Sequence, residues 1–317
     1  MLDTVSLNLG SGTGLVMSCV LALLMFGIAM GIRLDTLKKV FTRPKSILTG
    51  LILQWVGLPL VTFIMILLLS RWLTPMVALG MILVACCPGG NISNFMSSLS
   101  KGNVELSVSM TAVSTVCAPF LTPLNFWLWG NLFLKVAKLA DLMSIPHLQI
   151  PFVEVFKTVV LILGIPLVCG MLFAHYFPKV AEKCKKPFSI FSIVVFFVMV
   201  IGMLIPNWQQ IIHYVFLIFV VVLIQNAGAF GLGFAGATAM KLPFADRRSI
   251  TIEVGIQNSG LGLTMLLNPT IFNPDVWLNP TTGVMYGGML FVTAWWGIWH
   301  ILSGLGVTFM FNRSKKV

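Results

Sequence analysis

The chain carries few charged residues. Only 9% of its 317 residues are Asp, Glu, Lys or Arg, whereas 58% are hydrophobic and the mean hydropathy is +0.98. A soluble domain contains about 25% charged residues. This composition therefore excludes a water-exposed globular fold and indicates a protein embedded in the lipid bilayer.

Metal-binding and catalytic groupings are also scarce. The four histidines, His147, His175, His213 and His300, are scattered, and no two stand at i, i+4. None of the six cysteines has a partner at zinc-ligand spacing, and we interpret them as small packing residues. No Ser or Cys stands with a His or Asp at positions suited to catalysis. We therefore expect neither a transition-metal site nor an enzyme.

Apolar stretches of about 20 residues, enough to cross about 30 Å of hydrocarbon, recur along the chain. They predict an all-α polytopic membrane protein with nine transmembrane helices. The predicted spans are 13–32, 47–70, 76–99, 104–134, 152–176, 188–206, 210–240, 247–268 and 281–311.

The net charge of +11 is unevenly distributed between successive loops, which argues against a nucleic-acid partner. Cytoplasmic loops of membrane proteins collect Lys and Arg. The N-terminus is therefore expected outside and the C-terminus in the cytoplasm of a multi-pass cell-membrane protein, the inner membrane in a Gram-negative cell. The start, Met1 to Asp3, has no basic region before its apolar run and reads as a short extracytoplasmic lead rather than a cleaved signal peptide. The expected cytoplasmic basic residues are Arg33, Lys38, Lys39, Arg43, Lys45, Lys101, Lys179, Lys183, Lys185, Lys186, Lys241, Arg247, Arg248, Arg313, Lys315 and Lys316.

A single acidic residue, Glu253, lies in an apolar stretch with no basic residue to neutralise it. A carboxylate at the centre of a membrane costs about 2.5–3.5 kcal/mol on insertion scales, and such residues usually face an ion or substrate pathway. Glu253 is thus the first candidate functional residue.

Two of the predicted spans contain helix-breaking sequences followed by polar residues. Residues 85–94 read ACCPGGNISN, and residues 253–262 read EVGIQNSGLG. Each interruption could be a packing kink or an unwound binding segment. The two spans are five helices apart and so run in opposite directions, which is typical of an inverted repeat. Crossed at the midplane, the breaks would offer half-helix N-termini to an anion and free carbonyl oxygens to sodium.

Further oxygen ligands are available at compatible depth. Ser107 and Thr111 are four residues apart and share one helix face, and Gln54 lies early in the second span. Hydrogen bonding between helices is an equally good explanation of these three residues.

Three segments resemble the bile acid:sodium symporter family: CCPGGNISN, KGNVELSVSMTAVST (residues 101–115) and TIEVGIQNSGL. The resemblance covers essentially the whole chain. It implies a core domain with two crossing discontinuous helices, a flanking panel domain, and two sodium ions, with no other cofactor, that drive uptake of an organic anion. It implies one sodium site at Ser93, Asn94, Ser107, Thr111 and Glu253, another at Gln54, Glu253, Val254, Ile256 and Gln257, and a substrate site at Asn91, Asn258 and His300, with Val254 and Ile256 contributing backbone oxygens.

The same resemblance divides the chain into segments. These are residues 1–45 with the lead and first panel helix, 46–135 with the first half of the core and a break near 86–94, 150–207 with further panel helices, 208–312 with the second half of the core and a break near 253–262, and the basic tail 313–317.

Two departures from the family pattern bear on the substrate and the helix count. Similar bacterial sequences commonly have ten helices, and this chain begins at what resembles their second. Ile301 stands where they carry an Asn that can touch a bile acid. We expect a symporter of bile-acid-like or other small carboxylates. The alternatives are a proton-coupled anion carrier, with Glu253 shuttling a proton, and a non-transporting membrane receptor, which the short loops disfavour.

Overall fold

The computed structural model describes residues 13–32, 44–140, 152–205, 208–268 and 287–313. The expected lead, the first-loop residues Arg33, Lys38, Lys39 and Arg43, and the tail residues Lys315 and Lys316 lie outside this part. Within it, all regular structure is helical apart from one isolated β-bridge. The all-α expectation is therefore confirmed for the described residues.

The helices follow one another without any intervening strand in the described ranges. Their bounds are α1 Thr13–Ala29, α3 Pro44–Ile52, α4 Leu58–Leu68, α5 Pro75–Cys86, α6 Ile92–Leu99, α7 Val104–Leu139, α8 Phe152–Val159, α9 Ile165–Tyr176, α10 Pro178–Leu204, α11 Trp208–Ala239, α12 Phe244–Gly255, α13 Ser259–Leu266 and α15 Gly287–Arg313. Single π-helical turns, Leu53–Gly57 and Val160–Gly164, join α3 to α4 and α8 to α9.

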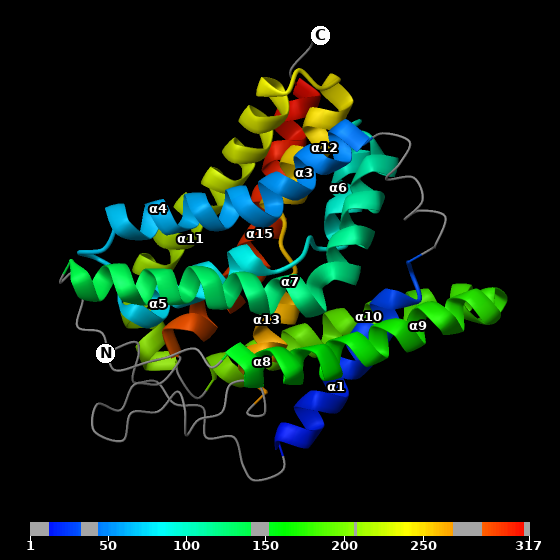
Figure 1. Ribbon diagram of the computed structural model, residues 1–317, viewed down its shortest axis with the longest axis horizontal. Helices are drawn as coiled ribbons and strands as arrows, with labels where there is room; N and C mark the ends of the chain where they lie inside the picture. Colours follow the sequence, from blue (N-terminus) through cyan, green and yellow to red (C-terminus); the bar gives the residue numbers. More distant parts are fainter. Residues whose placement is uncertain (1–12, 33–43, 141–151, 206–207, 269–286, 314–317) are drawn as a thin grey trace.

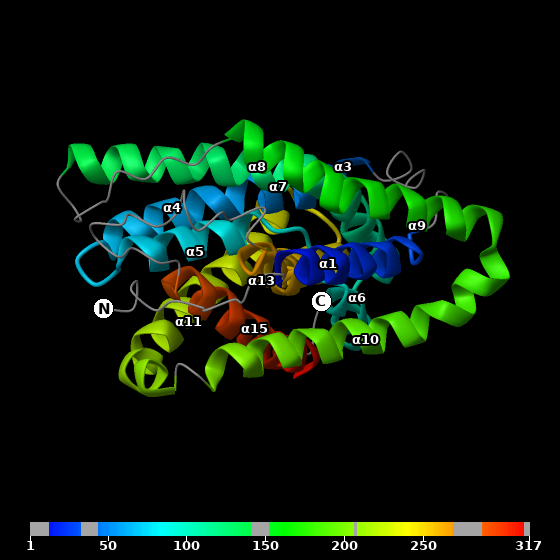
Figure 2. The same ribbon diagram turned by 90° about the horizontal axis from the view of Figure 1, so that it is seen from below.

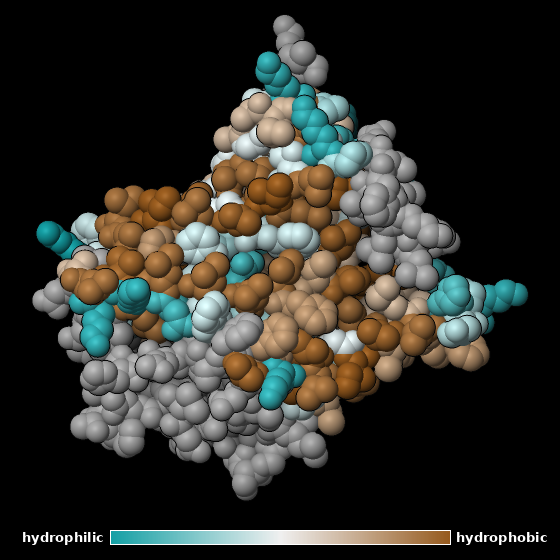
Figure 3. Space-filling model, in the orientation of Figure 1, coloured by the Kyte–Doolittle hydropathy of each residue, from teal (hydrophilic) through white to brown (hydrophobic). Residues whose placement is uncertain are grey.

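Four helical stretches of the described residues are long and apolar enough to cross a bilayer: Pro44–Leu68, Val104–Leu139, Ile212–Ala239 and Gly287–Arg313. Large apolar side chains are exposed on α4 and α7 at a spacing of four residues, including Leu60, Ile64 and Leu68 on α4. Figure 3 shows the corresponding hydrophobic surface, with hydrophilic residues mostly toward its extremities. Such a continuous apolar surface is suited to lipid rather than water.

Both predicted interruptions are present. Residues 87–91 separate α5 from α6, and residues 256–258 separate α12 from α13. The two unwound segments pair with each other, with Gly89 and Gln257 forming an antiparallel β-bridge. α12 lies in the upper part of Figure 1 and α13 in the lower part. We call the paired segments, residues 87–91 and 256–258, the crossover.

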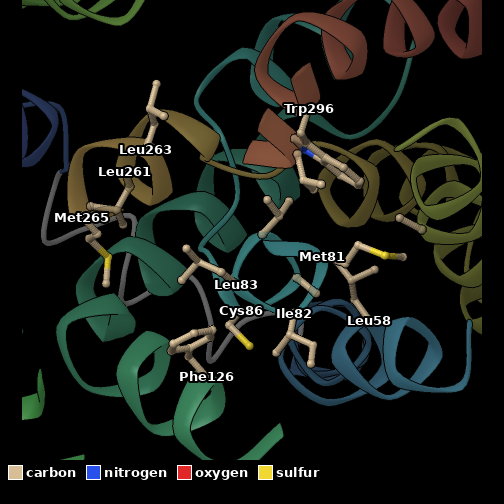
Figure 4. Packing of buried hydrophobic residues seen from close by; sticks show 14 of the residues in the cluster. Leu58, Met81, Ile82, Leu83, Cys86, Phe126, Leu261, Leu263, Met265 and Trp296 are labelled. Atoms are coloured by element: carbon tan, nitrogen blue, oxygen red, sulfur yellow. The ribbon is translucent and has the colours of Figure 1, made fainter. Parts of the chain in front are cut away.

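α5 is the central helix of the bundle. Every residue from Met76 to Cys86 is buried, which is typical of a helix that is apolar on all sides and has neighbours all around it. Figure 4 shows its side chains among residues of α4, α7, α13 and α15, with Phe126 and Trp296 among the largest fully buried. This packing holds the start of the crossover at the centre of the protein.

α1, α9 and α10 pack with one another at one side of the bundle. In Figure 2, α1 lies between α9 and α10. The ring of Phe26 on α1 is 5.7 Å from that of Phe173 on α9 and 6.0 Å from that of Phe188 on α10. These three helices therefore pack side by side, and α1 also contacts α13.

The structure extends one predicted span. α10 begins at Pro178, ten residues before the predicted start at 188. The additional turns contain Lys179, Glu182 and Lys183, so a hydropathy window excludes them although the backbone is helical. Helices continue beyond the apolar layer, and composition alone locates only the apolar part.

Candidate functional site

The carboxylate of Glu253 is fully buried on α12 and accepts three hydroxyl hydrogen bonds. Ser93 Oγ is 2.5 Å and Ser107 Oγ 2.8 Å from Glu253 Oε2, and Thr111 Oγ1 is 2.5 Å from Oε1. Ser93 lies in the first turn of α6, just after the interruption. Ser107 and Thr111 share one face of α7, as their spacing predicts. Three helices thus meet at this one carboxylate.

Asn94 adds a further oxygen to this group. Its side-chain Oδ1 lies 2.9 Å from Ser107 Oγ and 3.2 Å from Thr111 Oγ1. The same two hydroxyls also contact Glu253. We name Ser93, Asn94, Ser107, Thr111 and Glu253 the oxygen cluster; it contains all five residues that the family resemblance assigns to the first sodium site.

The hydroxyls of the oxygen cluster have fewer protons than the acceptors they contact. Its three hydroxyls carry one proton each, yet they contact both oxygens of Glu253, the Oδ1 of Asn94 and, from Thr111, the carbonyl oxygen of Ser107. Ser107 can donate to Glu253 or to Asn94 but not fully to both. A hard cation, which binds oxygen lone pairs and needs no proton, is chemically suited to such a group.

A second group of polar side chains lies beside Gly89 of the unwound segment. Gln54 comes from the π-helical turn Leu53–Gly57 and is fully buried, and its Nε2 lies 3.4 Å from Gln257 Oε1. Gln257 Nε2 donates to the carbonyl of Val254 at 2.8 Å. Gln54 Oε1 is buried without a hydrogen-bond partner. This group brings together Gln54, Val254 and Gln257 of the second expected sodium site. The carbonyl of Ile256, another residue of that site, accepts from Gly90 N at 2.9 Å.

Gly89 lies between the two groups. A Cβ at this position would collide with Glu253 Oε1 and would approach Gln54 Nε2 to 3.1 Å. Only a residue without a side chain fits there. Glu253 and Gln54 can therefore both reach the same stretch of backbone.

The three residues expected at the substrate site are less closely gathered. Asn91 is exposed immediately before α6, and Asn258 is partly buried immediately before α13. Asn258 Oδ1 accepts from Leu261 N at 3.1 Å and so caps α13, which leaves its amide hydrogens for another acceptor. His300 is buried on α15, and its Nδ1 lies 2.7 Å from the carbonyl of Trp296 in the same helix.

Two polar residues at the crossover were missed by the sequence reasoning. Ser114 Oγ accepts from Gly89 N at 3.3 Å, and its place three residues after Thr111 on the same helix face could have suggested this role. Asn226 Nδ2 donates to the carbonyl of Gly255 at 2.7 Å. Its position beside Gln225, as a pair of amides in the apolar run of α11, could have suggested a function.

The chain is similar to known sodium-dependent transporters. The model of the Sodium Bile acid symporter family matches residues 18–214. The sodium-dependent transporter YocS of Bacillus subtilis is 31% identical over 297 residues, which cover 93% of this chain and 83% of that protein.

The matches to two other relatives cover a smaller share of those proteins. A protein of Arabidopsis thaliana named "Probable sodium/metabolite cotransporter BASS1, chloroplastic" is 32% identical over 77% of this chain and 57% of its own length. Sodium/bile acid cotransporter 4 of Mus musculus is 29% identical over 81% of this chain and 57% of its own. The family match spans well over half of the chain, and the apolar helices are those of a multi-pass membrane protein. The chain belongs to the sodium bile acid symporter family, whose members are sodium-dependent transporters.

Proposed function

We propose that this protein couples the inward movement of sodium to the uptake of a small organic anion. The observation that carries the proposal is the shortage of hydroxyl protons in the oxygen cluster, where three hydroxyls face the acceptor oxygens of Glu253 and Asn94. A bound sodium ion would be held by these oxygens, and the charge of Glu253 would balance it. The names of the relatives, which state sodium dependence and metabolite or bile acid cotransport, support the same assignment.

The second sodium ion is proposed to bind at Gln54, Glu253, Gln257 and the backbone oxygens of Val254 and Ile256. The buried Oε1 of Gln54, which has no hydrogen-bond partner, supports this site. Glu253 would then be shared by both ions, so their binding would be coupled. No cofactor besides sodium is needed for this chemistry.

The anion is proposed to bind beside the crossover. Asn91 and Asn258 precede α6 and α13, whose N-termini carry partial positive charge. The free amide hydrogens of Asn258 can donate to a carboxylate. We propose bile-acid-like molecules or smaller carboxylates as substrates, with His300 as a further residue of this substrate site.

Transport is proposed to proceed by alternating access. In this proposal the nine predicted transmembrane helices form an inverted repeat. The core, residues 46–135 and 208–312, moves against a panel that includes α1 and α10. The N-terminus would lie outside the cell and the C-terminus in the cytoplasm. A cysteine introduced on the face of α1 or α10 toward the core should react with a membrane-impermeant maleimide at different rates with and without sodium. Equal rates at every such position would contradict the moving panel.

The decisive experiment is uptake of labelled organic anions into proteoliposomes. A sodium gradient should drive accumulation, and replacing sodium with potassium should abolish it. If a pH gradient alone drove uptake at the full rate, Glu253 would be a proton carrier and the sodium assignment would be wrong. If no gradient drove uptake of any carboxylate offered, a receptor would replace a transporter as the best explanation.

A further inference from the structure

α11 contributes nothing to the expected sodium sites, yet it packs closely along α12. A Cβ at Gly233 of α11 would lie 2.8 Å from the Cα of Thr251 on α12, so the two backbones touch here. Asn226 lies seven residues before Gly233 and so on the same face of α11. This face therefore reaches the end of α12 with one polar side chain, at the point where the crossover begins.

The side-chain amide of Asn226 is fully buried and has a fixed orientation. Its Nδ2 donates to the carbonyl of Gly255 at 2.7 Å, and its Oδ1 accepts from Ser303 Oγ of α15 at 2.5 Å. The reversed orientation would place two carbonyl oxygens against each other. The carbonyl of Gly255 thus determines which end of the amide faces it. Ser303 Oγ, which also lies 3.0 Å from the carbonyl of Trp299, supports this orientation by donating to Oδ1.

Gly255 is the last residue of α12, and its carbonyl has no partner within the helix. The neighbouring carbonyls turn toward the crossover, since Val254 O accepts from Gln257 Nε2 and Ile256 O from Gly90 N. Gly255 O is the one of these three that is bound from outside the crossover. Without Asn226 it would be buried and unpaired, which is costly enough to rotate the backbone. Any such rotation also turns the carbonyls on either side.

We propose that Asn226, held in this orientation by Gly255 and Ser303, is a positioning residue that aims the carbonyl oxygens of Val254 and Ile256 at a sodium ion. Asn226 does not touch the ion. It secures the intervening carbonyl of Gly255 and so fixes the rotation of the peptide units on both sides. The inference rests on the sodium coupling proposed above and adds a part of the protein that determines sodium affinity.

The test is a sodium titration of the melting temperature of the purified protein in lipid nanodiscs, with potassium keeping the ionic strength constant. Asn226→Ala is compared with Gln225→Ala. Gln225 is the adjacent buried amide, and its Nε2 donates to Met81 O at 2.8 Å and Thr62 Oγ1 at 3.2 Å, away from the crossover. Without sodium, both variants should have a lower melting temperature than the wild-type protein. Only Asn226→Ala should need more sodium to reach the same rise in melting temperature above its sodium-free value, by about five- to ten-fold, the equivalent of one buried hydrogen bond.

Ser303→Ala provides a milder second variant, which leaves Asn226 in place and removes the hydroxyl that donates to its Oδ1. It should raise the sodium concentration needed for the same rise in melting temperature by about two- to five-fold, and it decides the matter if Asn226→Ala does not fold. Wild-type titration curves from both variants would overturn the positioning role while leaving sodium coupling intact. An equal increase in Gln225→Ala would also overturn it. A wild-type protein that sodium does not stabilise would refute the proposed function itself, and this inference with it.

Discussion

Replacing Glu253 with Gln is the most direct test of the oxygen cluster. The substitution keeps the size of the side chain and one carbonyl oxygen but removes the only negative charge among the five residues. Ser93, Ser107 and Thr111 would still face an oxygen or an amide at the same position. The change therefore acts on charge more than on shape.

The expected loss of sodium affinity is large. The hydroxyl oxygens lie 2.5–2.8 Å from the carboxylate, so a cation bound to them would lie within about 4 Å of its charge. Two unit charges about 4 Å apart attract by about 4 kcal/mol at an effective dielectric constant of about 20. Losing this attraction weakens binding roughly a thousandfold.

Thermal stability reports this loss directly. At a sodium concentration about a hundredfold above Kd, the wild-type protein gains about 2.7 kcal/mol of stability from the ion. A site that binds about a thousandfold more weakly gains about 0.1 kcal/mol. The difference in melting temperature with and without sodium should therefore be large in the wild type and absent in Glu253→Gln. Comparing each protein with itself removes the effect of the substitution on the sodium-free state.

Glu105→Gln is the matched control, because Glu105 lies exposed in the first turn of α7. Its sodium-dependent stabilisation and uptake should equal those of the wild type. The reasoning would be refuted if Glu253→Gln kept the full sodium-dependent shift in melting temperature, since the charge of Glu253 would then play no part in binding the ion.

Other substitutions separate the remaining parts of the site. Asn94→Ala should raise the sodium concentration needed for half-maximal substrate binding. Asn258→Asp keeps the oxygen that caps α13 but should weaken anion binding about ten- to a hundred-fold, because a charge-assisted hydrogen bond is lost. Calorimetry with each ligand measures both effects, and an unchanged anion affinity in Asn258→Asp would place the substrate away from the crossover. Gly89→Ala should abolish sodium-dependent stabilisation because its Cβ would collide with Glu253, while Gly231→Ala, with nothing within 4 Å of its Cβ, should behave as wild type; a sodium response in Gly89→Ala would show that the cluster tolerates displacement. Lys101→Gly should stabilise the protein by about 1 kcal/mol in thermal unfolding, because Lys101 has a φ of 55° that Gly adopts without strain; a lower melting temperature would show that its side chain contributes more than its backbone costs.

Much of the candidate site could be predicted because its signals are local. Glu253 stands out as the only carboxylate in its apolar stretch, and a Pro-Gly-Gly sequence cannot continue a helix without loss. The four-residue spacing of Ser107 and Thr111 is enough to place both hydroxyls on one face of a helix. Each of these inferences needs only neighbouring residues.

The parts that could not be predicted depend on partners far apart in sequence. Asn226 contacts Gly255 and Ser303, which are 29 and 77 residues away, and nothing near it in the chain indicates these partners. The π-helical turn that carries Gln54 is followed by Pro59, which has no backbone N–H, but this local signal does not reveal that the turn brings Gln54 to Gln257. His300 bonds within its own helix, so its expected contact with substrate depends on its second ring nitrogen.

The crossover also constrains the order in which parts of the protein can pair during folding. Gly90 N donates to Ile256 O, and Asn258 N donates to Pro88 O, so the first unwound segment obtains its backbone partners from residues synthesised more than 160 positions later. Until then, its peptide groups have no protein partner from the second broken helix, and lipid offers none. The two halves of the chain can therefore pair at the crossover only after α12 and α13 have been synthesised. A nascent chain halted before residue 256 should leave the amide of Gly90 and the carbonyl of Pro88 without these partners, and closing the crossover is then a late step that joins the two halves of the chain.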